Sequence, residues 1–407
     1  MLSPEINKTY NRSLILVCNG IDEDTLAERK IISDSPAATR KVLGLAKVLS
    51  GNGVQVTVVS MGRGKTNGSM STYSSKAVTV EGINFLYAPF SHLPLWSQFL
   101  TVIGLFKLIL SFRKRKRISV LFYNRFPAYI PSMYVSKFFG FKLFLDLEDG
   151  YYESIKKETS IKKFYAQIVT HEFNRLCKDG TLLACRNLKR FIHTNNNLVY
   201  YGKINNIETR LKFTGDKIKI LMSGTLCEET GLNLLLDAVK FMRVNKLEWA
   251  SKFEFHVTGN SSEKNDLVAL HNEKSSPSLH FHGRLSHEKY KSILRSCDVG
   301  LSLKPIGGLQ AQTTFPSKIL EYGEAGLLVI STDISDVKML VGEGSVILQE
   351  NNVACLVDQF KIIANNQNEY RKVAIRGQNI LFGACSEDIV SIDLIKFLFK
   401  RSTAKNG

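Results

Sequence analysis

The chain has 407 residues, of which 44% are hydrophobic and 22% are charged. These proportions are typical of a globular protein and exclude a disordered tail, a collagen-like fibre and a small disulfide scaffold. Lys and Arg number 54 and Asp and Glu 37, so the net charge is +17. A basic balance of this size favours an anionic partner, such as nucleic acid, a membrane surface or a phosphorylated substrate.

The length predicts two to three domains, at roughly 150 residues per domain. The seven cysteines are scattered and form no C-x-x-C pair. We therefore expect reduced thiols in a cytosolic protein rather than a zinc site. The start of the chain has no cleavage site of a secretory signal, and no run of about 20 apolar residues predicts a spanning helix.

The first half alternates short apolar runs with segments of helical periodicity, which favours a parallel sheet with helices on both faces. Strands are predicted at 13–18, 54–60, 84–87, 119–123, 142–147 and 180–184. Helices are predicted from about residue 40 to Gly51 and over 128–139. The polar stretch 19–40 is expected to be a long loop.

A polar stretch near 195–206 predicts a domain boundary, after which the alternation restarts. Strands are predicted at 217–222, 253–257, 280–282, 299–303, 328–331 and 345–348, and helices at 231–241, 289–297, 317–325, 353–365 and 388–399. The expected parts are therefore domains 1–205 and 206–385, with a C-terminal helix and tail, 386–407, that can pack back on the N-terminal domain. Two doubly wound domains predict a ligand cleft between them, at the carboxyl ends of the strands.

The most informative local sequence runs from Phe315 to Ser331. Pro316 stands where a helix would begin, so the free amides and positive dipole of the first turn suit a phosphate. Lys318 adds a charge in that turn, and Glu321, about one turn later, can accept hydrogen bonds from sugar hydroxyls. An ordinary helix with solvated Lys and Glu side chains is the alternative.

Five further segments accompany this run in the second half. They are Ser223-Gly-Thr-Leu226, Glu229-Thr-Gly231, Val257-Thr-Gly259, Phe281-His-Gly-Arg284 and Cys297-Asp-Val-Gly-Leu301. In this order and spacing they resemble retaining GT-B glycosyltransferases, and most closely the GT4 type of bacterial surface-polysaccharide enzymes. The N-terminal half resembles the family only loosely. The resemblance implies an α/β fold of two Rossmann-like, doubly wound domains that face a central cleft, the GT-B fold.

The resemblance also implies that a nucleotide-sugar donor binds mainly to the second domain. Glu321 matches the second Glu of the family's E-x7-E motif and is expected to bind the ribose, and the backbone near Arg284 is expected to meet the base. The donor-binding residues implied are Gly224, Thr225, Gly259, Arg284, Lys304, Thr313, Thr314, Ser317, Lys318 and Glu321. Fixed donors aimed at the diphosphate lower the barrier as its charge develops. No metal or other cofactor is expected.

The chain departs from the family pattern at three positions. Thr313 replaces the first Glu of E-x7-E, Thr225 replaces a phosphate-binding Arg, and Thr230 replaces a Lys. Sugar recognition is then expected in a loop over 307–314, through backbone amides and the side chains of Gln310, Gln312, Thr313 and Thr314. An inactive homologue remains an open alternative.

In the first half, Asp146, Glu148 and Asp149 end an apolar strand. One of these carboxylates is predicted to polarise the acceptor hydroxyl or to hold the reacting sugar. The alternative for Asp149 is the N-cap of a helix over 151–157. Two arginines are candidates for a phosphate of donor or acceptor: Arg125, which follows a strand, and Arg40, in the first long loop. Arg125 can equally belong to a basic surface.

From 82 to 145 the chain has nine basic residues and no Asp or Glu. A helix over 95–112 would gather its polar residues on one half and leave the other apolar, with Trp96 near the border. A basic run follows at once: Arg113, Lys114, Arg115, Lys116 and Arg117. This pattern suits a helix lying in an anionic leaflet, although a core helix with a solvated basic end is the alternative. The basic run lacks interleaved aromatics, so nucleic acid is not expected.

The leading hypothesis is a glycosyltransferase in cell-surface polysaccharide biosynthesis, cytoplasmic and peripheral on the inner face of the plasma membrane. It would move a sugar from a nucleotide sugar to a lipid-linked or saccharide acceptor. Two alternatives are a sugar-nucleotide 2-epimerase, which shares the two-domain architecture, and a non-catalytic glycosyltransferase-like partner protein.

Overall fold

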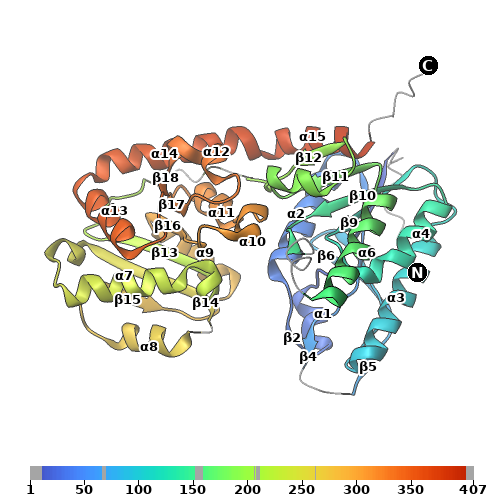
Figure 1. Cartoon of the computed structure of the whole chain (residues 1–407), viewed down its shortest axis with the longest axis horizontal. Helices are drawn as coiled ribbons and strands as arrows, with labels where there is room; N and C mark the ends of the chain where they lie inside the picture. Colours follow the sequence, from blue (N-terminus) through green and yellow to red (C-terminus); the bar gives the residue numbers. More distant parts are fainter. Residues whose placement is uncertain are drawn as a thin grey trace. The chain divides into compact units, whose positions relative to one another are not determined.

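The computed structural model describes residues 12–66, 70–151, 159–205, 207, 211–261 and 263–399 (Figure 1). The chain divides into two compact units. The N-terminal unit comprises 1–202 together with 390–407, and the C-terminal unit comprises 203–389. Each is built on a parallel sheet with helices, so the predicted α/β fold with two Rossmann-like units is confirmed.

The N-terminal unit has an eight-stranded sheet in the order β12-β11-β10-β9-β1-β3-β7-β6, parallel except for the antiparallel pair β6 and β7. Its strands are β1 (Ser13–Cys18), β3 (Gln55–Ser60), β6 (Lys76–Val80), β7 (Ile83–Tyr87), β9 (Ile118–Tyr123), β10 (Lys142–Leu147), β11 (Gly180–Leu183) and β12 (Asn197–Val199). Four short strands form two antiparallel pairs: β2 (Ile31–Ser33) with β4 (Lys65–Thr66), and β5 (Thr72–Tyr73) with β8 (Phe90–Ser91). The central strands are largely apolar and buried because helices cover both faces of the sheet.

Helices of the N-terminal unit form two groups. On one face, α2 (Pro36–Gly51) and α15 (Glu387–Phe399) share a core with β1, β3 and β9. Three further helices follow one another (Figure 1): α4 (Ile130–Phe138) contacts both α3 (Pro94–Ser111) and α6 (Ser160–Leu176). A short helix, α1 (Glu23–Glu28), follows β1. Residues 152–158, which include most of the predicted helix 151–157, lie outside the described part of the chain.

The predicted loop over 19–40 is wrong in two respects. It contains α1 and β2, and α2 begins already at Pro36, whose fixed φ and missing N–H suit the first helical turn. Thr39 and Arg40 therefore lie on α2, and the Arg40 side chain is exposed.

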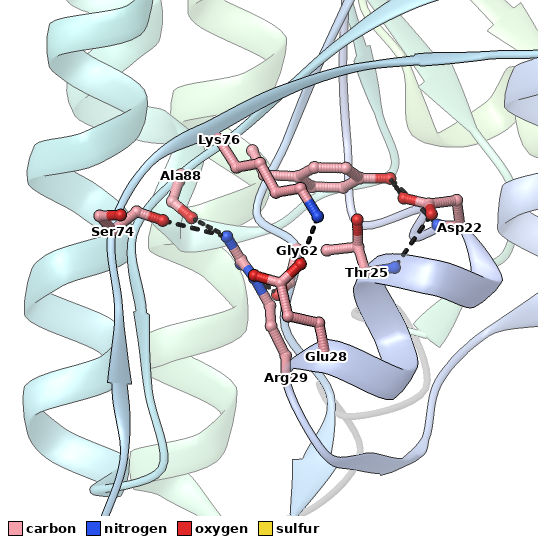
Figure 2. Close-up of polar contacts among 9 residues, drawn as sticks. Asp22, Thr25, Glu28, Arg29, Gly62, Ser74, Lys76 and Ala88 are labelled. Carbon is pink, nitrogen blue, oxygen red and sulfur yellow. Dashed lines mark hydrogen bonds and ion pairs between the residues drawn. The ribbon is translucent and has the colours of Figure 1, made fainter.

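The buried side chain of Arg29 joins the segments that follow β1, β3 and β7 (Figure 2). Its guanidinium donates to the carbonyl oxygens of Gly62 at 2.6 Å, Ala88 at 3.0 Å and Ser74 at 3.4 Å. The Tyr87 ring centroid lies 5.5 Å from the guanidinium carbon. A Cβ on Gly62 would lie 2.5 Å from a guanidinium nitrogen, so this approach requires glycine. Three carbonyls and a ring together fix the loops at this end of the sheet.

The C-terminal unit has a six-stranded, fully parallel sheet in the order β15-β14-β13-β16-β17-β18. Its strands are β13 (Ile218–Leu226), β14 (Phe253–Ser261), β15 (Ser278–Phe281), β16 (Val299–Ser302), β17 (Leu328–Thr332) and β18 (Ser345–Leu348). Its helices are α7 (Leu232–Val244), α8 (Lys264–Asn272), α9 (His287–Ser296), α10 (Gly308–Thr313), α11 (Lys318–Glu324), α12 (Val337–Val341), α13 (Val353–Asn365) and α14 (Gln367–Cys385). The main core lies between the sheet and helices α7 and α13.

Candidate functional site

The ends of β13 and β14 approach each other so closely that both carry glycine. Gly224 has φ 122° and Gly259 has φ 141°, a region that other residues rarely adopt. A Cβ on Gly259 would lie 1.7 Å from the carbonyl oxygen of Gly224. Thr225, which the resemblance expects in a loop near the diphosphate, instead lies within β13, close to its end, and is exposed.

Thr230, which replaces a lysine of the family pattern, closes the turn after β13. Its hydroxyl donates to the carbonyl oxygen of Thr225 at 2.8 Å and accepts from the amide of Cys227 at 3.1 Å. Gly231 follows with φ 84°, and a Cβ there would lie 1.9 Å from the carbonyl oxygen of Leu303. The threonine therefore shapes the loop and adds no charge to it.

Glu321 lies in a hydrogen-bonded network beside Gly224. The ammonium of Lys318 lies 2.7 Å from Glu321 Oε2, and the hydroxyl of Tyr290 donates to the same oxygen at 2.7 Å. Lys318 Nζ also donates to the Tyr290 hydroxyl at 3.1 Å. The Lys318 side chain reaches Gly224, since a Cβ on that glycine would lie 3.5 Å from Lys318 Cε. A carboxylate held in this way keeps capacity to accept ribose hydroxyls.

Two tyrosines join this network to the end of β13. Ser223 Oγ lies 3.1 Å from the Tyr290 hydroxyl and 3.0 Å from the Tyr322 hydroxyl, which also accepts from the Ser223 amide at 3.1 Å. Burial raises the pKa of Tyr290 and of Tyr322, and the nearby carboxylate of Glu321 adds to the effect. Both hydroxyls therefore remain protonated donors. Sequence reasoning missed Tyr290, because a tyrosine on an amphipathic helix gives no signal beyond packing.

The segment 307–314, predicted to be a loop, contains the short helix α10 (Gly308–Thr313), so the predicted loop is wrong, whereas its role in reading the sugar stays a prediction. The prediction for the Thr313 side chain is also wrong, because it is fully buried and its hydroxyl donates to the Leu309 carbonyl within the helix. Lys304 Nζ donates to Thr314 Oγ1 at 3.2 Å. Ser317, which precedes α11, and Arg284 are exposed. Lys304, Thr314, Ser317 and Arg284 remain candidates for ligand contact.

Of the predicted carboxylates of the N-terminal unit, Asp146 lies within β10 and Glu148 and Asp149 follow the strand. Asp146 and Glu148 share a lysine. Lys41 Nζ, on α2, lies 2.8 Å from Asp146 Oδ1 and also forms an ion pair with Glu148 Oε1. Asp146 is fully buried. Burial raises the pKa of Glu148 to about 7, with Lys41 acting to lower it and Asp146 to raise it. A carboxyl group that titrates near neutral pH is suited to acid–base chemistry. Sequence reasoning missed Lys41, which lies 105 residues from Asp146.

Asp149 and Arg125 have structural partners. Asp149 Oδ1 accepts from the Tyr151 amide at 3.1 Å, which is the capping arrangement that the sequence left open. Arg125 is 2% exposed and donates to the Phe191 carbonyl at 2.9 Å. The prediction that Arg125 meets a phosphate is therefore wrong, because a cation this buried holds the protein backbone.

Helix α3 buries small and polar side chains and exposes several large apolar ones, unlike an ordinary amphipathic helix. Ser97, Thr101 and Gly104 face inward with Leu105 and Ile109, and a Cβ on Gly104 would lie 2.2 Å from Pro89 Cδ. Apolar side chains face outward instead: Leu95 (84% exposed), Trp96 (46%), Phe99 (53%) and Phe106 (38%). The five basic residues after the helix, Arg113, Lys114, Arg115, Lys116 and Arg117, are all exposed.

The described part of the chain contains no cluster of three or more His, Cys, Asp or Glu side chains arranged to hold a metal ion. Within the same residues, every helix is too short or too polar to cross a bilayer.

The sequence was compared with known families and proteins. The family model described as "Glycosyl transferases group 1" matches residues 203–380, which is most of the C-terminal unit. The match contains the Glu321 network and the glycine pair Gly224 and Gly259. None of the curated proteins matches the chain.

Several solved structures share the fold over the whole chain. Sucrose-phosphate synthase from Thermosynechococcus elongatus aligns with a TM-score of 0.67 at 12% identity, over 94% of this chain and 97% of that one. A glycosyltransferase from Rickettsia africae aligns at 0.65 and 16% identity, over 97% and 100%. The HepE protein of Anabaena, in complex with UDP and glucose, aligns at 0.63 and 12% identity, over 95% and 99%. The C-terminal unit therefore carries a glycosyl transferases group 1 domain and the chain has the GT-B fold, which together support a glycosyltransferase enzyme.

Proposed function

We propose that the protein transfers a sugar, with retention of configuration, from a nucleotide-sugar donor to a lipid-linked saccharide acceptor in cell-surface polysaccharide biosynthesis. The observation that carries the donor half is the network of Glu321, Lys318, Tyr290 and Ser223 beside Gly224, inside the group 1 domain. The aligned HepE protein binds UDP and glucose in its solved structure, which supports the same class of donor.

The donor site is proposed to work as follows. Glu321 accepts hydrogen bonds from the ribose hydroxyls, oriented by the Tyr290 hydroxyl on one of its oxygens. Lys318 and Lys304 offer positive charge to the diphosphate, whose negative charge grows as the glycosidic bond breaks. None of these roles requires a metal ion, so we expect the rate of turnover to be unchanged when a chelator is added.

The acceptor is proposed to bind in the N-terminal unit, near Glu148 and Asp146 at the end of β10. A carboxyl group with a pKa near 7 can polarise the hydroxyl that attacks the sugar.

An apolar surface with a basic border supports a lipid-linked acceptor. Helices α3, α4 and α6 expose several large side chains, and we name six of them the docking surface: Leu95, Trp96, Phe99, Phe138, Ile161 and Phe164. Phe138 and Ile161 are each 84% exposed. The basic run 113–117 follows α3, and no acidic residue lies between 82 and 145. Apolar side chains beside cationic ones suit the anionic inner leaflet of a plasma membrane, where we propose that the protein docks from the cytoplasm.

Protection against thermal unfolding tests the donor site. A ligand that binds only the native state raises its stability in proportion to ln(1 + [L]/Kd). In a panel of nucleotide sugars, at least one is expected to raise the melting temperature of the wild type, and the rise is expected to shrink in Glu321→Ala. Glu288→Ala, which removes an exposed carboxylate of the same unit, is the matched control and should keep the full rise.

Three other results would point elsewhere. If Glu288→Ala also loses the rise in melting temperature, the loss in Glu321→Ala would not be specific to the donor site. Conversion of a free nucleotide sugar without acceptor would favour a 2-epimerase. Binding without turnover in the presence of acceptor would favour the non-catalytic protein, which the threonines at 225, 230 and 313 raise as an alternative.

A further inference from the structure

Lys41 is placed by α2 at the carboxyl end of β10, where it is largely buried. Its side chain is 14% exposed, against 0% for Asp146 and 21% for Glu148. Lys47 on the same helix behaves differently, since it is 40% exposed and pairs with Glu81 on the surface. Burying a lysine is unfavourable unless its partners compensate, so the position of Lys41 calls for an explanation.

The charges around Lys41 do not balance. Two carboxylates, Asp146 and Glu148, share the one ammonium, and Asp149 adds to the negative charge nearby. Arg125 lies close enough to Asp149 to act to lower the pKa of that carboxyl group, so three carboxylates are near two cations. The neutral rings of Tyr123 and Tyr200 lie with their centroids 6.0 Å and 5.4 Å from Lys41 Nζ. A purely structural ion pair needs one acid for one base. The surplus carboxylate means that the cluster holds or releases one proton as the pH changes.

We propose that Lys41 is a positioning residue that fixes the charge and the orientation of Glu148. Its ammonium binds Asp146 and one oxygen of Glu148, which holds the Glu148 carboxylate in one orientation and keeps it ionised. In that form Glu148 can accept a hydrogen bond from the acceptor hydroxyl. The assignment of the acceptor rests on the proposed function, but the effect of Lys41 on Glu148 does not.

The direction of the effect follows from electrostatics. Burial raises the pKa of Glu148 from its ordinary 4.5 to about 7, although Lys41 pulls it down. Removing the ammonium leaves burial and Asp146 unopposed, so the pKa of Glu148 must rise further. Such a rise shifts proton uptake to higher pH and removes the carboxylate form at neutral pH.

Protein stability reports this pKa without any substrate. Because the pKa of Glu148 is higher in the folded state, its contribution to stability is fully present below pH 4.5 and is lost as pH rises through about 7. The experiment measures the free energy of unfolding from pH 4 to 9 for the wild type and Glu148→Gln, and takes the difference. The same difference is measured in the Lys41→Met background, with Lys47→Met as the control background.

The stability difference between the chain with Glu148 and its Glu148→Gln variant is expected to stop changing near pH 7 in the wild-type and Lys47→Met backgrounds. We call this pH the stability limit, and it is expected to lie at least one pH unit higher in Lys41→Met. An unchanged limit in Lys41→Met would overturn the proposal. If Lys41→Met does not fold, Asp146→Asn is compared with Lys41→Met/Asp146→Asn, which lacks both partners. The limit is then expected to lie higher in the double variant, and equality would again overturn the proposal.

A kinetic arm separates this proposal from the proposed function. If acceptor glycosylation is observed, the acid limb of its kcat/KM profile is expected to move upward in Lys41→Met by the same amount as the stability limit, and to return in Lys41→Arg. A shifted stability limit without any glycosylation would support the role of Lys41 and contradict the function. If glycosylation occurs but neither the stability limit nor the acid limb of the kcat/KM profile moves in Lys41→Met, the result would support the proposed function and contradict the role of Lys41.

Discussion

The Tyr290 hydroxyl contacts Ser223, Lys318 and Glu321. In Tyr290→Phe, the Glu321 carboxylate keeps its ion pair with Lys318 but loses the hydrogen bond from the Tyr290 hydroxyl. One hydrogen bond to a charged group contributes about 1.5 kcal/mol or more, so roughly tenfold weaker binding of the donor is expected. Calorimetric titration with the nucleotide sugar measures the change, and Tyr370→Phe, a partly buried tyrosine of the same unit, is the control. Equal affinities for Tyr290→Phe and wild type would show that the network does not serve the donor.

Some residues of the candidate site could be predicted from a local sequence motif, and others could not because their contacts are distant in the sequence. Lys318 and Glu321 could be predicted because both follow Pro316 within one short motif. Tyr290 and Lys41 could not, since their roles depend on partners 31 and 105 residues away, respectively. Thr313 was placed wrongly because the sequence does not indicate that α10 forms and buries its side chain.

At the scale of elements, α3 is the one whose packing bears most on function. Its residues Ser97, Thr101 and Gly104 face inward with Leu105 and Ile109. The exposed apolar side chains are Leu95, Trp96, Phe99 and Phe106, and the exposed basic run 113–117 follows the helix. Replacing Lys114, Arg115 and Lys116 by Gln should weaken binding to anionic vesicles by about 3 kcal/mol, at about 1 kcal/mol for each charge near the surface. Vesicle co-sedimentation measures the loss.

A charge-matched variant controls for this effect. Lys246, Lys361 and Lys372 are exposed lysines of the C-terminal unit, and their replacement by Gln should leave vesicle binding unchanged. Leu95→Ser combined with Phe99→Ser should weaken binding to neutral as well as anionic vesicles, because it removes apolar contact rather than charge. Equal losses in the basic-run variant and its control would contradict docking through α3.

Most strands could be predicted, because buried parallel strands read as short apolar runs. Helices with weaker patterns could not: α6 exposes Ile161 and Phe164 on its outer side, which obscures its periodicity, and α14 went unpredicted. The direction in which α3 packs was also not readable, since it depends on the close approach of Gly104 to Pro89.

At the scale of the whole molecule, the alternation of strands and helices was enough to predict two Rossmann-like units. The last helix joins the N-terminal unit through contacts distant in sequence: Ser119 Oγ donates to the Leu398 carbonyl at 3.1 Å, and the Phe144 and Phe397 ring centroids lie 5.2 Å apart. The sequence analysis allowed this helix to pack back on the N-terminal unit, but local pattern alone does not specify the contacts, because both sheets offer apolar faces.

Turnover is the decisive test of whether this glycosyltransferase uses a nucleotide sugar held by the Glu321 network. The measurement is release of nucleoside diphosphate from the donor that gives thermal protection, with polyprenyl-diphosphate-linked saccharides in anionic vesicles and with chelator present. We expect release coupled one to one with a glycosylated lipid, reduced at least tenfold in Glu321→Gln. Equal turnover in Glu321→Gln, or release that stops when metal is chelated, would contradict the proposed donor site.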